Sequence, residues 1–168
     1  MIGNYEMKYL VDRFNEYGTR NLKNVSRGKF NCGGYALGTY NWILPCDTDE
    51  DADELFEVNL WLEDIEDIDF DRRAEICATW MLNNIPNLRR VDSPDEKLAD
   101  DEWLIGFKMG LGPSGDGDFH YIKRTPTGRF YHKPGSAKIM RMSKKEALSD
   151  SWMHDSYTSN TIWLVRKK

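Results

Sequence analysis

The chain has 168 residues, of which 40% are hydrophobic, and this is enough to build the core of one domain spanning residues 1–168. Its formal net charge is −5, with acid concentrated between Asp47 and Asp71, which argues against nucleic-acid binding because that function needs a basic face. No apolar run is long enough to cross a membrane, and the segment from Met1 to Arg13 lacks the apolar stretch of a signal peptide.

The first helices are predicted from the spacing of apolar residues and from capping residues. An amphipathic helix is expected over residues 4–17, and a second begins at Cys32, where Asn31 can act as the N-cap. Residues 49–62 read as a helix or a mobile acidic segment. A stronger helical pattern covers residues 71–82, which predicts a buried face on that helix.

The second half of the chain has the patterning of strands. Trp103, Ile105 and Phe107 alternate on one side of a predicted strand, and the glycine-rich residues 110–117 that follow predict a loop. Strands are expected over residues 88–91, 103–109, 118–124, 129–132, 137–140 and 161–166. Helices first and an antiparallel sheet second predict an α+β domain.

The three cysteines have irregular spacing and form no Cys-x-x-Cys pair, so we expect neither a disulfide framework nor a structural zinc site. Free thiols are typical of a reducing compartment, which predicts a cytoplasmic protein, in a bacterial host if the chain is phage-encoded. Cys46 and Cys77 are interpreted as packing residues. We expect no metal ion and no cofactor.

Cys32 is the candidate nucleophile. A free thiol has a pKa near ~8.5, and a helix N-terminus or a nearby imidazolium lowers that value and favours the thiolate. Cys32 follows the capping residue of its predicted helix, which places the sulfur at the helix start. Gly33 and Gly34 are expected to leave room for a substrate beside the sulfur.

Two of the three histidines lie on neighbouring arms of a predicted hairpin. His120 and His132 are twelve positions apart, and side chains on paired strands can touch. We expect His120 to act as the base and His132 to orient its ring. Asp118 is expected to contact the substrate, or alternatively to be the orienting group, whereas His154 is expected at the surface.

These segments resemble a known family of enzymes. The resemblance rests on His120 in one strand, His132 in the next, and the segment Asn31-Cys32-Gly33-Gly34-Tyr35-Ala36. Together they are similar to the NlpC-type branch of papain-like cysteine peptidases, and also to uncharacterised phage and bacterial proteins. The resemblance implies a papain-like fold with N-terminal helices packed on an antiparallel sheet. It further implies cleavage of an amide bond through an acyl-enzyme, in this family often within peptidoglycan peptides.

The expected function is therefore that of a cysteine peptidase or amidase with a Cys32-His120-His132 site, acting on a peptide, a protein or a peptidoglycan peptide. Acyl transfer and glutamine deamidation use the same acyl-enzyme and stay open. A different class also stays open: a non-catalytic phage or bacterial binding protein, such as a host-factor inhibitor or a virion component. The sequence does not predict an oligomeric state.

Overall fold

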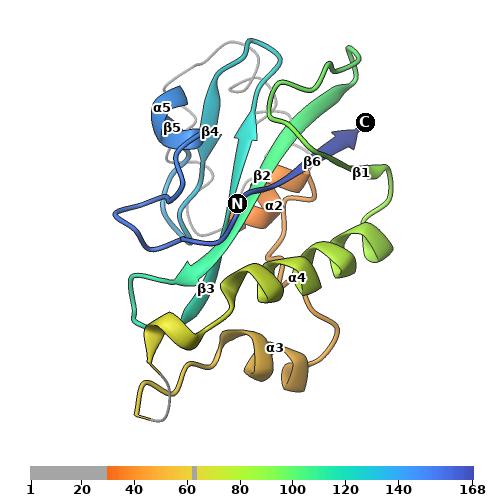
Figure 1. The fold of residues 1–168 in the computed structure, drawn as a ribbon. Helices are drawn as coiled ribbons and strands as arrows, with labels where there is room; N and C mark the ends of the chain where they lie inside the picture. The colour runs from red at the N-terminus through yellow and green to blue at the C-terminus, as the bar shows by residue number, and fades with distance from the viewer. Residues whose placement is uncertain (1–29, 62–63) are drawn as a thin grey trace.

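A computed structural model describes residues 30–61 and 64–168 of the chain. Its centre is a six-stranded antiparallel sheet in the order β1-β6-β2-β3-β4-β5 (Figure 1). The strands are β1 Leu88–Val91, β2 Glu102–Leu111, β3 Gly117–Arg124, β4 Phe130–His132, β5 Met140–Met142 and β6 Ile162–Lys167. The helices are α2 Cys32–Leu37, α3 Asp49–Phe56, the 3-10 turn η2 Ile65–Asp67, α4 Phe70–Asn84 and α5 Lys144–Ala147. The helix predicted over residues 4–17 lies outside the described residues.

The α+β prediction is confirmed, with two strand boundaries corrected. The loop predicted over residues 110–117 is shorter, because β2 continues to Leu111 and that residue pairs with Gly117. The strand predicted over residues 137–140 is wrong for most of its length. A turn closed by the backbone bond from Ala137 to Pro134 occupies those residues, and β5 begins only at Met140.

The sheet has an apolar cluster on each face. On one face, Ala74, Cys77 and Met81 of α4 pack in a cluster that includes Phe107 and Tyr121 of the sheet. Figure 1 shows α4 and α3 side by side below the sheet. The predicted buried face of α4 is thus confirmed, and Ile76 of the same helix lies off that face, 44% exposed.

The opposite face carries a second cluster, in which Leu104, Ile122 and Trp163 of the sheet surround Trp152 from the connection before β6. Side chains alternate along a strand, so consecutive residues of β3 belong to different faces. Tyr121 packs on the α4 face, and His120 therefore points to the Trp152 face.

Helix α2 is fixed by the side chain of its N-cap, as predicted. Asn31 Oδ1 accepts hydrogen bonds from the backbone N–H of Gly34 at 3.0 Å and of Ile43 at 3.1 Å, and Asn31 Nδ2 donates to Ile43 O at 2.8 Å. The helix ends after six residues at Gly38, which has a φ of 71°. Asn31 therefore joins the start of α2 to the segment that follows it.

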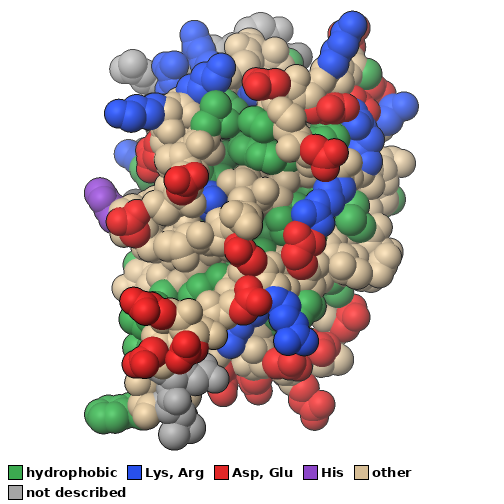
Figure 2. All heavy atoms as spheres, in the orientation of Figure 1, with side chains coloured by type: hydrophobic (Ala, Val, Ile, Leu, Met, Phe, Trp, Pro, Cys, Tyr) green, Lys and Arg blue, Asp and Glu red, His purple; other side chains and the backbone are tan. Residues whose placement is uncertain are grey.

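The surface of the lower helices is acidic. Figure 2 shows acidic side chains gathered over the lower part of the face drawn, where α3 and α4 lie in Figure 1. Three acids occupy the first turn of α3, where they complement the positive end of the helix dipole. Within the described part of the chain, no helix has the length and apolar character needed to span a membrane.

Replacing the buried cap should destabilise the fold more than replacing an exposed one. Asn31→Ala removes three hydrogen bonds at a residue that is 6% exposed, so we expect the free energy of unfolding to fall by about 2–3 kcal/mol. Thr48→Ala removes the exposed cap of α3 and should cost about 1 kcal/mol. Urea unfolding measures both, and equal losses would contradict the role given to Asn31.

Candidate active site

The site lies where β3 extends beyond its neighbour β4. Strand β4 pairs only with residues 122–124, whereas β3 begins at Gly117. The edge of β3 at residues 117–121 is therefore not covered by β4. Helix α2 reaches this edge from one face of the sheet, and the Tyr157 segment reaches it from the other.

A cavity of about 330 Å³ opens at this edge and brings the predicted nucleophile and base together. Its lining includes Cys32 at the start of α2 and His120 on β3. Asp118 and Gly135 line it as well, and Tyr157 closes one side. Residues from four distant parts of the chain thus share one cavity.

The two histidines are hydrogen-bonded to each other, as the hairpin predicted. His120 Nε2 lies 2.8 Å from His132 Nδ1, and the rings are nearly perpendicular, at 86°. His120 is 1% exposed and His132 is 6% exposed. Because Nε2 of His120 is engaged, Nδ1 is the ring nitrogen left for proton transfer; it has no hydrogen-bond partner among residues 30–61 and 64–168.

Tyr157 holds the His120 ring from the side and was not anticipated. The two rings are stacked, with centroids 5.1 Å apart and planes 21° apart, and Trp152 contacts the same imidazole edge-on at 6.3 Å. The Tyr157 hydroxyl donates to Asp118 Oδ2 at 2.8 Å. Burial and the Asp118 carboxylate both raise the pKa of Tyr157, so the hydroxyl keeps its proton and remains a donor.

An unusual backbone turn carries Tyr157 into position. Three consecutive residues without glycine, Met153, His154 and Asp155, have φ values of 53°, 56° and 62°. Such left-handed conformations are unfavourable for L residues and need support from their surroundings. The support comes from the pairing of Trp152 with Tyr157 across the turn. His154 is exposed, as expected.

The Cys32 sulfur is buried, which sets its protonation state. It is 4% exposed, and desolvation raises the pKa of the thiol to about 12, far above its ordinary value. Hydrogen bonding from the backbone of Tyr121 and of Gly33 opposes this rise, the carboxylate of Asp118 adds to it, and the ammonium of Lys133 weakly opposes it. Cys32 is therefore a neutral thiol at neutral pH.

Burial also keeps both histidines neutral. Desolvation, followed by the neighbouring His132, lowers the pKa of His120 well below its usual value. Desolvation lowers the pKa of His132 to about 4. The expectation that the helix start and a nearby imidazolium lower the pKa of Cys32 is therefore corrected. Within the described residues no hydrogen bond joins Cys32 Sγ to either ring, and the thiol and the imidazoles are uncharged.

The two glycines after Cys32 serve packing and do not provide the open space that was expected. A Cβ on Gly34 would lie 1.9 Å from Asn41 O, and a Cβ on Gly33 would lie 3.0 Å from the Tyr121 ring. Protein atoms thus occupy the space beside both residues. Asp118, the third residue expected to contact a substrate, does line the cavity.

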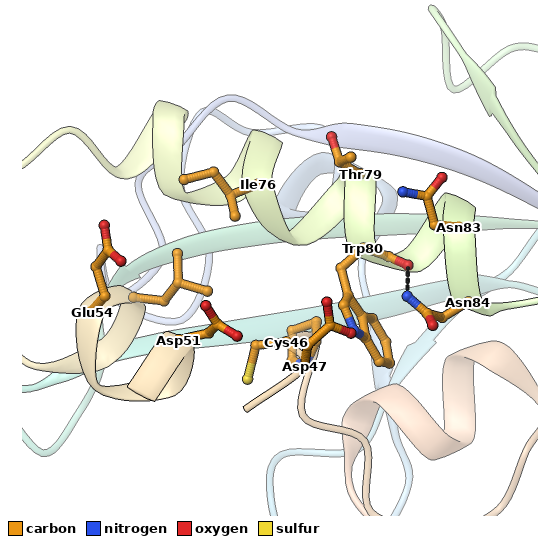
Figure 3. A pocket seen from close by; sticks show the side chains of 11 residues that line it. Cys46, Asp47, Asp51, Glu54, Ile76, Thr79, Trp80, Asn83 and Asn84 are labelled. Atoms are coloured by element: carbon orange, nitrogen blue, oxygen red, sulfur yellow. Dashed lines mark hydrogen bonds between the residues drawn. The ribbon is translucent and has the colours of Figure 1, made fainter. Parts of the chain in front are cut away.

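A second cavity of about 330 Å³ lies between α3 and α4, away from the histidines (Figure 3). Asp51 and Glu54 of α3 line one side, and Trp80 of α4 lines the other, with its indole N–H bonded to Asp47 at 2.5 Å. Cys46 also lines this cavity, but burial and neighbouring carboxylates raise its pKa and no histidine lines the cavity with it. This cavity therefore contains a thiol but no histidine that could accept its proton.

The described residues show no metal centre and no second cavity that pairs a cysteine with a histidine. In residues 30–61 and 64–168 no group of three or more metal-ligating side chains comes together, and all three cysteines are free. Cys77 is fully buried, with Sγ 3.6 Å from Met109 Sδ, whereas Cys46 is only partly buried. Among the described residues, the Cys32 cavity is thus the one that brings a thiol and a histidine together.

The buried histidine pair should make folding stability depend on pH. In the native state the pKa of His132 is about 4, below its unfolded value near ~6.5, so the unfolded chain binds the proton more readily. Stability from this group is complete above pH ~6.5 and is lost as pH falls toward 4, by up to about 3 kcal/mol.

Urea unfolding at pH 7 and pH 4.5 measures this loss. The variant His132→Asn keeps a polar group but cannot take up the proton, so its loss between the two pH values should be smaller than that of the wild type. Equal losses in the two proteins would mean that His132 is not buried in its neutral form.

Comparisons of the chain with protein-family models, with curated proteins and with solved structures found no match. The resemblance of the sequence to NlpC-type peptidases therefore stays a prediction, and the chemistry of the site follows from its own geometry.

Proposed function

We propose that this chain is a single-domain cysteine hydrolase of the papain-like, NlpC-type fold that cleaves an amide bond. The observation that carries the proposal is the cavity shared by Cys32 and His120, together with the 2.8 Å bond from His120 Nε2 to His132 Nδ1. That bond fixes one nitrogen of the base and leaves the other for the thiol. Cys32 is the nucleophile, His120 the base, and His132 the orienting residue.

The reaction begins with proton transfer from Cys32 Sγ to His120 Nδ1 as the sulfur attacks the carbonyl carbon of the amide. The tetrahedral intermediate collapses when the C–N bond breaks, and the imidazolium gives its proton to the leaving amine. This leaves a thioester on Cys32. Water, deprotonated by the neutral His120, then attacks the thioester and releases the acid, and the thiol is restored.

The buried, uncharged resting state suits general-base catalysis. A neutral imidazole accepts a proton, and the lowered pKa of His120 keeps it neutral through the physiological range. A thiol with a raised pKa does not ionise before substrate binds. Proton transfer to His120 therefore accompanies attack on the substrate.

The substrate is a peptide or a protein, and a peptidoglycan peptide is the case that the family resemblance supports. Asp118 adds a carboxylate to the cavity wall and favours a substrate group that donates hydrogen bonds or carries positive charge. Acyl transfer to an amine and glutamine deamidation proceed through the same thioester. Three free cysteines suit a reducing compartment, which supports the cytoplasm as the proposed location.

One observation favours a second function of a different class. Cys32 is almost fully buried, its thiol pKa is raised, and it makes no hydrogen bond to the imidazoles within the described residues. An inert cysteine of this kind is typical of packing. The alternative is a non-catalytic phage or bacterial binding protein that uses the same cavity to hold a peptide of a partner.

Thiol labelling distinguishes these two functions, because the chain contains a matched control. Burial raises the pKa of both Cys32 and Cys77 to about 12, but only Cys32 shares a cavity with a histidine. If His120 is the base, iodoacetamide should label Cys32 at least about tenfold faster than Cys77 at pH 7.5, read by peptide mass mapping. His120→Asn should remove most of that difference.

The second function, in which Cys32 is an unreactive packing residue of a binding protein, predicts a different labelling result. Labelling of Cys32 that is unchanged by His120→Asn would exclude the base and favour the binding function. His120→Asn replaces the ring by a smaller amide, so any increase in access to the sulfur would speed labelling and does not account for a slower rate.

Turnover is measured with short peptide amides and with soluble muropeptides, by following the mass of the products. We expect Cys32→Ala to abolish cleavage and His120→Asn to lower kcat by about 10²–10⁴-fold, since proton transfer contributes that range. His132→Asn should lower kcat less, because an amide can still accept or donate one hydrogen bond to the ring. Cleavage that persists in a folded Cys32→Ala protein would contradict the proposal.

A further inference from the structure

Lys133 is a buried cation that binds the wall of the Cys32 cavity through Gly135, and the mechanism above does not use it. It follows His132 directly in the chain and is 0% exposed. Its ammonium donates to Gly135 O at 2.8 Å and lies over the Phe30 ring, 5.1 Å from the centroid. A carbonyl dipole and a ring face solvate a cation, but neither one neutralises its charge.

Both groups that hold the ammonium belong to the surroundings of Cys32. Phe30 precedes Cys32 by two residues at the entry to α2, and Gly135 lines the cavity together with Cys32. The electrostatic interaction is mutual: the charge of Lys133 lowers the pKa of Cys32, and Cys32 raises that of Lys133. The buried ammonium is therefore placed to act on the sulfur.

The other charged and titratable groups around Cys32 do not supply this positive charge. Asp118 on β3 and the hydroxyls of Tyr121 and Tyr157 oppose a negative sulfur or are uncharged, and His120 is neutral at rest. Helix α2 has only six residues, so its dipole is short. Among these groups, Lys133 carries the full positive charge.

We propose that Lys133 is the counter-cation of the Cys32 thiolate. When the thiol proton moves to His120 Nδ1, the sulfur becomes an anion and the imidazole a cation, and in a site of low dielectric both charges are costly. The ammonium stays protonated throughout and stabilises that anion without taking part in proton transfer. Within the described residues no carboxylate forms an ion pair with this ammonium, so its charge is available to the sulfur when the thiol loses its proton.

The ionisation of Lys133 gives this inference a measurable signature. Desolvation lowers the pKa of Lys133 to about 8, so the ammonium is present at neutral pH and is lost above it. Below pH 8 the thiol proton passes to the neutral His120 and is not lost to solvent, so the rate of Cys32 alkylation should change little with pH. Above pH 8 Lys133 loses its proton and the sulfur loses this stabilising charge, so the rate should fall.

The test is the pH dependence of Cys32 alkylation by iodoacetamide in the full chain, from pH 6.5 to 9.5, read by mass mapping of the Cys32 peptide. The wild type should show a break near pH 8. Lys133→Met should remove the break and lower the rate at pH 7 by about tenfold, which corresponds to one unit of thiol pKa. A wild-type rate that does not fall between pH 7 and pH 9 would overturn the proposal, even if the variant fails to fold.

Lys123→Met is the matched control for loss of a buried lysine. Lys123 lies on β3, is 5% exposed, and has its ammonium over the rings of Tyr35 and Trp103. Its charge is not among those that act on Cys32. We expect Lys123→Met to keep the break near pH 8, and loss of the break in this variant would also overturn the assignment to Lys133.

This inference rests on the proposed function only in naming Cys32 as the nucleophile, and the two can fail separately. Alkylation needs no substrate. A break near pH 8 without turnover of any amide would leave the ion pair in place and refute the hydrolase. Turnover together with an unbroken profile would retain the hydrolase and refute the role of Lys133.

Discussion

The early end of strand β4 is the constraint on which the site depends. Because β4 stops pairing at Ile122, the preceding residues of β3 keep an edge that no strand covers. His132, the last residue of β4, then lies diagonal to His120 and within hydrogen-bond reach of its ring. The same uncovered edge admits Cys32 from one face of the sheet and Tyr157 from the other. A longer β4 would fill the space that these side chains share.

Burial decides the chemistry of the assembled groups. Desolvation is the largest influence on the pKa of Cys32, of both histidines and of Lys133, and in each case it favours the uncharged form. In the proposed mechanism, Cys32 and His120 stay uncharged until a substrate binds, and charge develops on them only as bonds change. The cost of that transient charge is what the hydrogen bonds and the buried ammonium have to reduce.

The sequence predicted those parts of the site that depend on local patterns. Asn31 as a cap and the hairpin that joins His120 to His132 follow from short-range rules, and both are present. Tyr157 had no such signal, since its contact with His120 depends on the path of a long connection. The roles of Gly33 and Gly34 were also out of reach, because the backbone of Asn41, which approaches the α2 start, is fixed only by the tertiary fold.

The three left-handed residues from Met153 to Asp155 have an unfavourable backbone conformation, and the turn that they form orients Tyr157 against His120. Glycine at these positions would relieve the backbone strain of the turn, but it would also make the turn more flexible. The Tyr157 ring would then no longer be held at a fixed angle to the His120 ring. A more stable backbone in this turn and a fixed orientation of the His120 ring therefore require different residues at the same three positions. Substitutions to glycine in this turn would loosen the orientation of the His120 ring without changing Cys32, His120 or His132 themselves.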